Sequence, residues 1–139
     1  MTNIFKKGER LTIKQLIGTV VAGDGRGMSI GFPTANLKLN EEAEKPTDGV
    51  YACLVQVLPD DVVYQAILHV GPRPTFRGAE ASVEVHILDF KQRTLYGSEL
   101  RAFSFYYIRS NEKFSSSKEL IDAITQDSET AKELLSNKL

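Results

Sequence analysis

The stretch VYACLVQVLPDDVVYQAILHV at residues 50–70 decides the fold of this chain. Two runs rich in β-branched and aromatic residues, 50–58 and 62–70, flank the short turn Pro59-Asp60-Asp61. Such runs favour β-strands, and a turn of this length joins neighbouring strands as a hairpin. The stretch therefore predicts a pair of antiparallel strands.

Similar runs lie on both sides of this pair. Residues 82–88 and 100–108 have the same composition, 17–21 form a shorter β-branched run, and another strand is expected near 35–39. No helical pattern separates these runs, so parallel crossover connections are disfavoured. Five or six antiparallel strands can close on themselves and leave no exposed edge, so we expect a mainly β protein built on a small barrel.

The last 25 residues change to a helical pattern, because apolar side chains recur there with a period of 3.6. These side chains are Leu120, Ile121, Ile124, Ala131, Leu134 and Leu135. The segment Ser116-Ser117-Lys118-Glu119 fits a capping box at the start of a helix. We expect this helix over residues 115–136, packed outside the barrel. Asp127 and Ser128 leave open whether it is one helix or two shorter ones.

Length and charge limit the classes of function. The chain has 139 residues, 17 basic and 18 acidic, and a chain of this length predicts one domain. From the strand pattern we expect an arm at 1–16 and a barrel over 17–110. A net charge of -1 argues against nucleic-acid or membrane partners, which attract a basic excess. The single cysteine, Cys53, cannot form an internal disulfide, and no apolar run approaches the ~20 residues of a membrane span. We expect a cytoplasmic monomer.

A glycine-rich loop follows the first predicted strand. Gly23-Asp24-Gly25-Arg26-Gly27 could let backbone N–H groups approach a phosphate without interference from Cβ atoms. The loop lacks the Gly-Lys-Ser/Thr ending of a P-loop, and no predicted helix follows it as in a dinucleotide-binding motif. Glycine content alone leaves a structural turn and a phosphate site both open.

The segment Pro33-Thr34-Ala35-Asn36 adds oxygen donors. Thr34 and Asn36 are two residues apart, so an extended backbone points both side chains to one face. A hydroxyl and an amide oxygen suit Mg²⁺ when substrate phosphates and water supply the other ligands. The alternative is a pair of turn residues that bond their own backbone.

A candidate base lies in the run at 82–88. Alternation places Val83, Val85 and Ile87 on one face and Glu84, His86 and Leu88 on the other. Glutamate is unusual within a strand, and a carboxylate can accept a proton from a hydroxyl that attacks phosphorus. The alternative is a solvent-facing charge. We interpret His86 as a structural histidine, and the two histidines and one cysteine do not predict a zinc site.

The final strand is rich in aromatic residues. Strict alternation places Arg101, Phe103, Phe105 and Tyr107 on one face and Tyr106 on the other, which indicates core packing more than a ligand stack. Arg109 and Phe114 then flank a short loop, which could cover a flat ligand or simply connect the strand to the helix.

These motifs, taken in order, resemble the riboflavin kinase family over about residues 18–135. The matching segments are Gly23-Asp24-Gly25-Arg26-Gly27, Gly31-Phe32-Pro33-Thr34-Ala35-Asn36-Leu37, Asp48-Gly49-Val50-Tyr51-Ala52, Val70-Gly71 with Pro74-Thr75-Phe76, Val83-Glu84-Val85-His86-Ile87-Leu88-Asp89-Phe90, Leu95-Tyr96-Gly97, and Ile108-Arg109 followed by Lys113-Phe114. A chance match to one segment would mean little, whereas the ordered series is specific.

The resemblance implies a six-stranded antiparallel Greek-key barrel with a C-terminal helix outside it. It also implies transfer of the γ-phosphate of ATP to the 5′-hydroxyl of riboflavin to give FMN, with Mg²⁺. Glu84 would be the catalytic base, and Thr34 and Asn36 would hold the metal. The implied ATP-binding residues are Gly23, Gly25, Arg26, Gly27, Gly31, Pro33 and Thr34, and the implied flavin-binding residues are Tyr96, Gly97, Arg109 and Phe114.

Two residues depart from the family pattern. His69 stands where the family usually has Asn, and Asn111 where an acidic residue is common. We expect neither to touch the metal site or the base, so both should bear on flavin affinity and loop behaviour more than on the reaction class. The alternatives are a flavin-binding regulatory module with little catalysis, and the kinase domain of a bifunctional FAD synthetase. FAD synthesis by this chain is not expected, and the near-neutral charge disfavours an oligonucleotide-binding barrel.

Overall fold

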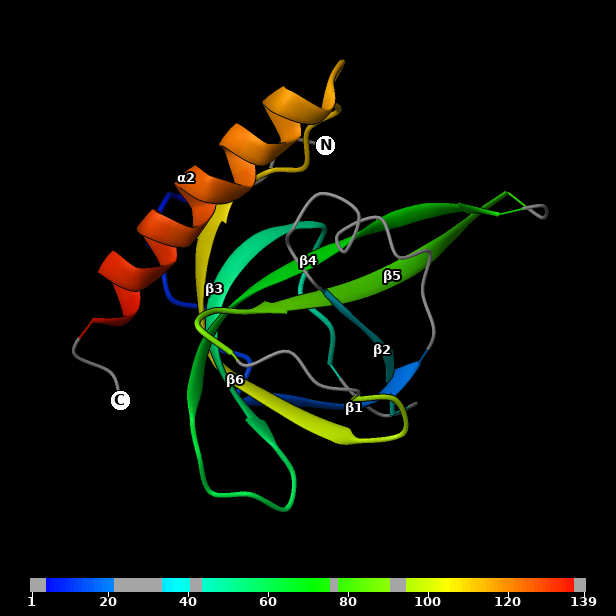
Figure 1. The fold of residues 1–139 in the computed structure, drawn as a ribbon, viewed down its shortest axis with the longest axis vertical. Helices are drawn as coiled ribbons and strands as arrows, with labels where there is room; N and C mark the ends of the chain where they lie inside the picture. Colours follow the sequence, from blue (N-terminus) through cyan, green and yellow to red (C-terminus); the bar gives the residue numbers. More distant parts are fainter. Residues whose placement is uncertain (1–4, 22–33, 41–43, 76–77, 91–94, 137–139) are drawn as a thin grey trace.

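The computed structural model describes residues 5–21, 34–40, 44–75, 78–90 and 95–136. Figure 1 shows a barrel with a helix lying across its outside. The strands are β1 (Gln15–Val21), β2 (Ala35–Leu39), β3 (Gly49–Val57), β4 (Tyr64–Thr75), β5 (Gly78–Ile87) and β6 (Glu99–Arg109), and the helix is α2 (Ser117–Leu135). In this part of the chain no helix is long and apolar enough to cross a bilayer.

The strands close into a barrel in the order β1-β2-β5-β4-β3-β6, and every neighbouring pair is antiparallel. β3, β4 and β5 are consecutive neighbours, whereas the connections from β2 to β3 and from β5 to β6 reach more distant strands, as in a Greek key. The predicted mainly β barrel with an external C-terminal helix is confirmed. The hairpin predicted around Pro59 is also present, since Val55 pairs with Tyr64.

β4 and β5 are longer than predicted and form an arm that projects from the barrel in Figure 1. Pro72 and Pro74 lie within this extension of β4. Beyond Val70, however, β4 pairs with β5 alone. One row of its N–H groups therefore faces no partner strand, and prolines at alternate positions of that row remove no ladder bond.

Buried side chains form two layers, one inside the barrel and one between the barrel and α2. β3 contributes to both, because Tyr51, Cys53 and Val55 point inward while Ala52 and Leu54 pack under the helix layer. This explains why β3 is an almost continuous apolar run rather than an alternating one. The helix contributes Ala131 and Leu135 to the outer layer.

The strict alternation predicted for the aromatic strand β6 is wrong. Phe105 and Tyr107 belong to the inner layer, whereas Phe103 packs against the outer one. The backbone of Ser104 adopts a positive φ of 56°, and the pairing register with β3 shifts at this point. This bulge inserts one residue and exchanges the faces beyond it. Arg101 and Phe103 therefore stack on each other outside the barrel, with the guanidinium 4.2 Å from the ring centroid.

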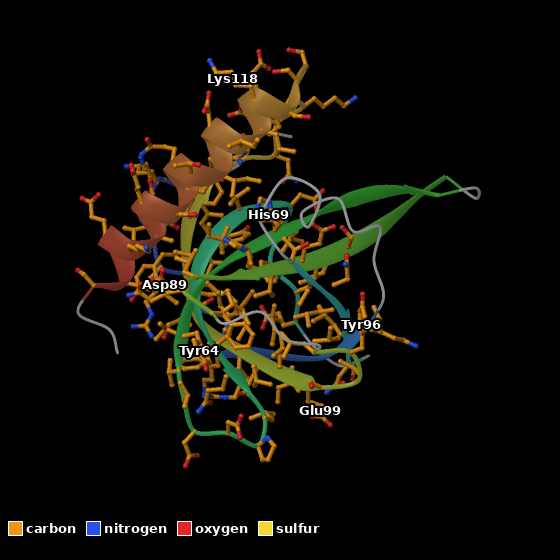
Figure 2. All side chains as sticks on the ribbon, viewed as in Figure 1. Tyr64, His69, Asp89, Tyr96, Glu99 and Lys118 are labelled. Carbon is orange, nitrogen blue, oxygen red and sulfur yellow. The ribbon has the colours of Figure 1, made fainter. Side chains whose placement is uncertain are left out.

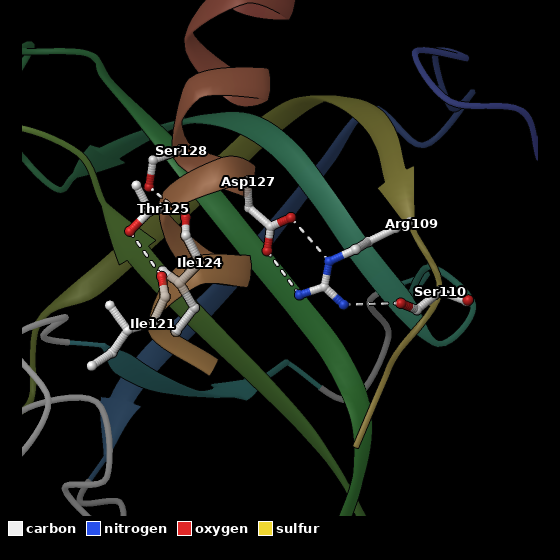
Figure 3. A network of polar contacts seen from close by, with 7 residues as sticks. All are labelled: Arg109, Ser110, Ile121, Ile124, Thr125, Asp127 and Ser128. Carbon is white, nitrogen blue, oxygen red and sulfur yellow. Dashed lines mark hydrogen bonds and ion pairs between the residues drawn. The ribbon is translucent and has the colours of Figure 1, made fainter. Parts of the chain in front are cut away.

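The helix α2 begins where the sequence predicts. Ser116 is its N-cap, and its hydroxyl accepts a hydrogen bond from the backbone N–H of Glu119. It is one uninterrupted helix, because Ser128 donates to the carbonyl of Ile124 and Asp127 pairs with Arg109 across the helix–barrel interface (Figure 3). Arg109 Nε and Nη2 donate to the two oxygens of Asp127 at 2.9 and 2.8 Å.

The described residues before β1 pack against β6 and form the N-terminal arm. The N–H groups of Gly8 and Leu11 donate to the carbonyls of Tyr107 and Phe105, and Tyr107 donates back to Glu9. Phe5 packs on the Tyr107 ring, with centroids 5.7 Å apart. The N-terminal arm therefore supplies backbone hydrogen-bond partners to the part of β6 that follows the bulge.

We expect Asp127→Asn to lower the free energy of unfolding by about 3 kcal/mol, because the Asp127 side chain is only 3% exposed and its loss leaves the guanidinium without a counter-charge. Urea unfolding followed by circular dichroism measures this. Asp122→Asn, on the exposed face of the same helix, is the control and should change stability by no more than about 0.5 kcal/mol. Equal midpoints for the two variants would contradict the role of the pair.

The bulge at Ser104 gives a second test. Ser104→Val should lower the free energy of unfolding by about 1–2 kcal/mol, because a β-branched side chain is strained at positive φ. Ser104→Gly should be at least as stable as the parent, because glycine adopts this conformation without strain. The same urea titration separates them, and a destabilised glycine variant together with an unchanged valine variant would refute the bulge.

Candidate active site

One row of residues crosses the outer surface of the barrel. Successive cross-strand partners connect Val21 to Asn36, Asn36 to Glu84, Glu84 to His69, His69 to Val50 and Val50 to Arg109. The residues beside them in sequence, such as Val83 and Val85, point into the core, so the row faces outward. We call these six residues the cross-strand row. It brings the predicted metal ligand Asn36 directly beside the predicted base Glu84.

Asn36 carries an unusual oxygen. Its Oδ1 atom is buried and has no hydrogen-bond partner among the residues that the structure describes. A buried acceptor without a partner is rare in folded proteins and calls for a ligand. Ala35 is buried in the core, so Asn36, the next residue of β2, faces outward, and Thr34 directly precedes the strand. A hydroxyl and an amide oxygen beside a carboxylate fit the all-oxygen ligand set of Mg²⁺.

Glu84 lies in the middle of β5 and is partly exposed. Its two cross-strand partners are Asn36, which has no charge, and His69. Burial lowers the pKa of His69 to about 4; the Asp127 carboxylate opposes this shift, while Arg109 and His86 add to it. The imidazole of His69 is therefore neutral near pH 7, and neither strand neighbour places a charge beside the carboxylate.

The expectation that His69 lies away from the base is wrong, because it pairs directly with Glu84. The sequence separates the two residues by a hairpin, and only the register of β4 against β5 brings them together. Figure 2 shows His69 on the barrel wall below the N-terminal half of α2. Asn111 also lies close to His69, since its Nδ2 donates to the carbonyl of Val70, the next residue of β4, at 2.9 Å.

The Arg109 end of the row is tied to the helix. Besides its two bonds to Asp127, the guanidinium donates to the carbonyl of Ser110 and lies 5.7 Å from the ring centroid of Phe114. Arg109 and Phe114, both predicted on the flavin side, are thus neighbours. Sequence reasoning missed Asp127, although an acid on the apolar face between Ile124 and Ala131 was a visible signal.

Tyr96 and Gly97 were predicted in the same group but lie elsewhere. The N–H of Gly97 donates to the carbonyl of Val20, which places this turn beside the end of β1. Val21 follows and pairs with Asn36, so the turn is at the opposite end of the row from Arg109. Tyr96 is 68% exposed and stands well apart from His69 in Figure 2.

The remaining predicted ATP-binding residues lie outside the described residues. They are Gly23, Gly25, Arg26, Gly27, Gly31 and Pro33.

Comparison with known proteins gives concordant matches. The family described as Flavokinase, riboflavin kinase, matches residues 12–135. A bifunctional riboflavin kinase/FMN adenylyltransferase of Bacillus subtilis is 40% identical over 123 residues, which are 86% of this chain and 38% of that protein. The crystal structure of riboflavin kinase from Trypanosoma brucei has a TM-score of 0.65 and 25% identity, over 92% of this chain and 84% of that one.

A crystal structure described as a macrolide-efflux protein from Streptococcus pneumoniae has a TM-score of 0.76 and 39% identity, over 85% of this chain and 38% of that one. That description belongs to the Streptococcus protein. The present chain spans less than two fifths of the length of that protein and of the Bacillus relative. Because the family match extends from residue 12 to residue 135, the chain belongs to the riboflavin kinase family.

Proposed function

We propose that this chain transfers the γ-phosphate of ATP to the 5′-hydroxyl of riboflavin, with Mg²⁺, and releases FMN and ADP. One observation carries the proposal: Asn36, whose buried Oδ1 has no partner among the described residues, is the cross-strand partner of Glu84 on the outer face of a riboflavin kinase barrel. A metal ligand and a base on adjacent strands are what phosphoryl transfer to a hydroxyl requires.

The nucleotide is proposed to bind at the Asn36 end of the row. Thr34 and Asn36 would hold Mg²⁺ through their side-chain oxygens, and Gly23, Gly25, Arg26, Gly27, Gly31 and Pro33 would surround the ATP phosphates. When bound, Mg²⁺ neutralises charge on the phosphate oxygens. The turn at Tyr96 and Gly97 lies at this end, so we assign it to the nucleotide rather than to the flavin ring.

Glu84 is proposed to accept the proton of the riboflavin 5′-hydroxyl. As the hydroxyl oxygen bonds to the γ-phosphorus, the bond from that phosphorus to the bridging oxygen of ADP breaks. The proton moves to a carboxylate oxygen of Glu84. The position of Glu84 on the outer face of the barrel, as the cross-strand partner of Asn36, supports this role.

The acceptor is proposed to extend from Glu84 past His69 toward the side of the barrel where Arg109 and Phe114 lie, around Val50, which is buried under the helix layer. Three strand spacings separate Glu84 from Arg109, about 14 Å along the barrel surface. This span suits a tricyclic ring that carries a five-carbon chain. The proposal covers phosphoryl transfer alone, by a monomer in the cytoplasm, where the buried thiol of Cys53 would stay reduced.

Glu84→Gln should lower kcat for FMN formation by about 10²–10⁴ with little change in the KM for either substrate, because the amide keeps the shape but cannot accept the proton. Chromatography of riboflavin, ATP and Mg²⁺ mixtures measures this. Glu99→Gln removes an exposed strand carboxylate away from the row and should keep the parent rate. Unchanged turnover in Glu84→Gln would remove Glu84 from the mechanism, and a parent protein that binds flavin without turnover would indicate a regulatory module.

Asn36→Leu should abolish most FMN formation while leaving the ligand-free protein as stable as the parent, or more stable by about 1 kcal/mol. The reason is that leucine removes a buried acceptor that no described residue satisfies. Thermal unfolding without ligands and the FMN assay measure the two effects.

Gln56→Leu is the matched control for Asn36→Leu. Gln56 Oε1 accepts a hydrogen bond from Arg101 Nη1 at 2.7 Å, outside the row. This variant should therefore lose stability and keep activity, which is the opposite pattern. A strongly destabilised Asn36→Leu protein, or one with full activity, would contradict the metal role.

A further inference from the structure

His69 occupies the middle of the proposed acceptor path. Along the cross-strand row it is next to Glu84 on β5 and next to Val50 on β3, and Arg109 follows on β6. Directly opposed antiparallel residues have Cβ atoms about 4.5–5.5 Å apart. His69 is thus one strand from the base and two strands from the arginine beside Phe114. An acceptor that extends from Glu84 across β4 therefore meets His69 first.

The surroundings of His69 suit hydroxyl groups. Glu84 and His86 face it from β5, Arg109 from β6 and Asp127 from α2. The two charges on the helix side cancel, because Arg109 and Asp127 bond each other through two hydrogen bonds. A partly exposed neutral imidazole has one N–H donor and one nitrogen acceptor, so it can bond a hydroxyl in either sense.

We propose that His69 determines acceptor specificity by hydrogen-bonding the hydroxyls of the polyol chain between the reacting 5′-hydroxyl and the flavin ring. This inference rests on the proposed function. It assigns to His69 a contact with substrate that differs from those of Glu84, which takes the proton, and of Arg109 and Phe114, which flank the ring. Val50 cannot share this role, because it is 1% exposed beneath the helix layer.

Two flavins distinguish a contact with the polyol chain from a contact with the flavin ring. Riboflavin has both the ring and the polyol chain, whereas lumiflavin keeps the ring and replaces the chain with a methyl group. The dissociation constant of each is measured by quenching of flavin fluorescence, for the full chain and its variants. Flavin binding needs no turnover, so the dissociation constants can be measured even if the parent protein makes no FMN. Absence of FMN formation would contradict the proposed function and leave the test of His69 intact.

His69→Leu should weaken riboflavin binding about tenfold, the effect of one lost hydrogen bond to a polar ligand, and leave lumiflavin binding unchanged. Its KM for riboflavin should rise and its KM for ATP should not. His69→Asn should restore most of the preference for riboflavin, because an amide also donates and accepts. Gln65→Leu alters the same outer face of β4 outside the row and should leave the preference unchanged.

Three results would overturn the proposal. Equal weakening of both flavins in His69→Leu would mean that the residue only shapes the fold or the ring site. A fall in kcat with an unchanged riboflavin dissociation constant would mean that His69 acts on Glu84 and not on the chain. A parent protein that binds riboflavin no more tightly than lumiflavin would show that no chain contact exists.

Discussion

The register of β5 against β2 and β4 is the constraint on which the rest of the structure depends. Val83 and Val85 fill the barrel, and the same alternation turns Glu84 outward between Asn36 and His69. A slip of one residue would bury the carboxylate among core side chains and expose the valines. Packing of the core therefore fixes the geometry of the candidate site, without any residue dedicated to that purpose alone.

The closed barrel also decides where a ligand can bind. Its interior is filled by side chains from all the strands, among them the fully buried Tyr51 and Phe105. A substrate must therefore lie on the outer wall, and α2 already covers one part of that wall. The wall that remains beside the helix holds Glu84 and His69. The helix, held there by the Arg109–Asp127 pair, would thus bound the proposed acceptor path on one side.

The sequence predicts well what depends on local pattern, and poorly what depends on register. Strand runs, the hairpin at Pro59 and the Ser116 cap are local features, and all are present. The outward bulge at Ser104 follows from pairing with β3, so alternation alone could not find it. The contact between His69 and Glu84 has the same origin. Glu84 is a candidate because glutamate is unusual within a strand, and Asn36 because it supplies an oxygen donor two residues from Thr34, whereas their adjacency needed the fold.

The two buried faces of β3 have a consequence for the dynamics of the molecule. β3 is paired on both edges, by β4 and β6, and is covered on both sides. Its amide hydrogens can exchange with solvent only when the whole barrel opens. Beyond Val70, β4 and β5 pair only with each other among the described residues, so this hairpin can open without the barrel. His69 and Glu84 lie where this hairpin joins the barrel, so the candidate site stands on strands that open only together with the whole barrel.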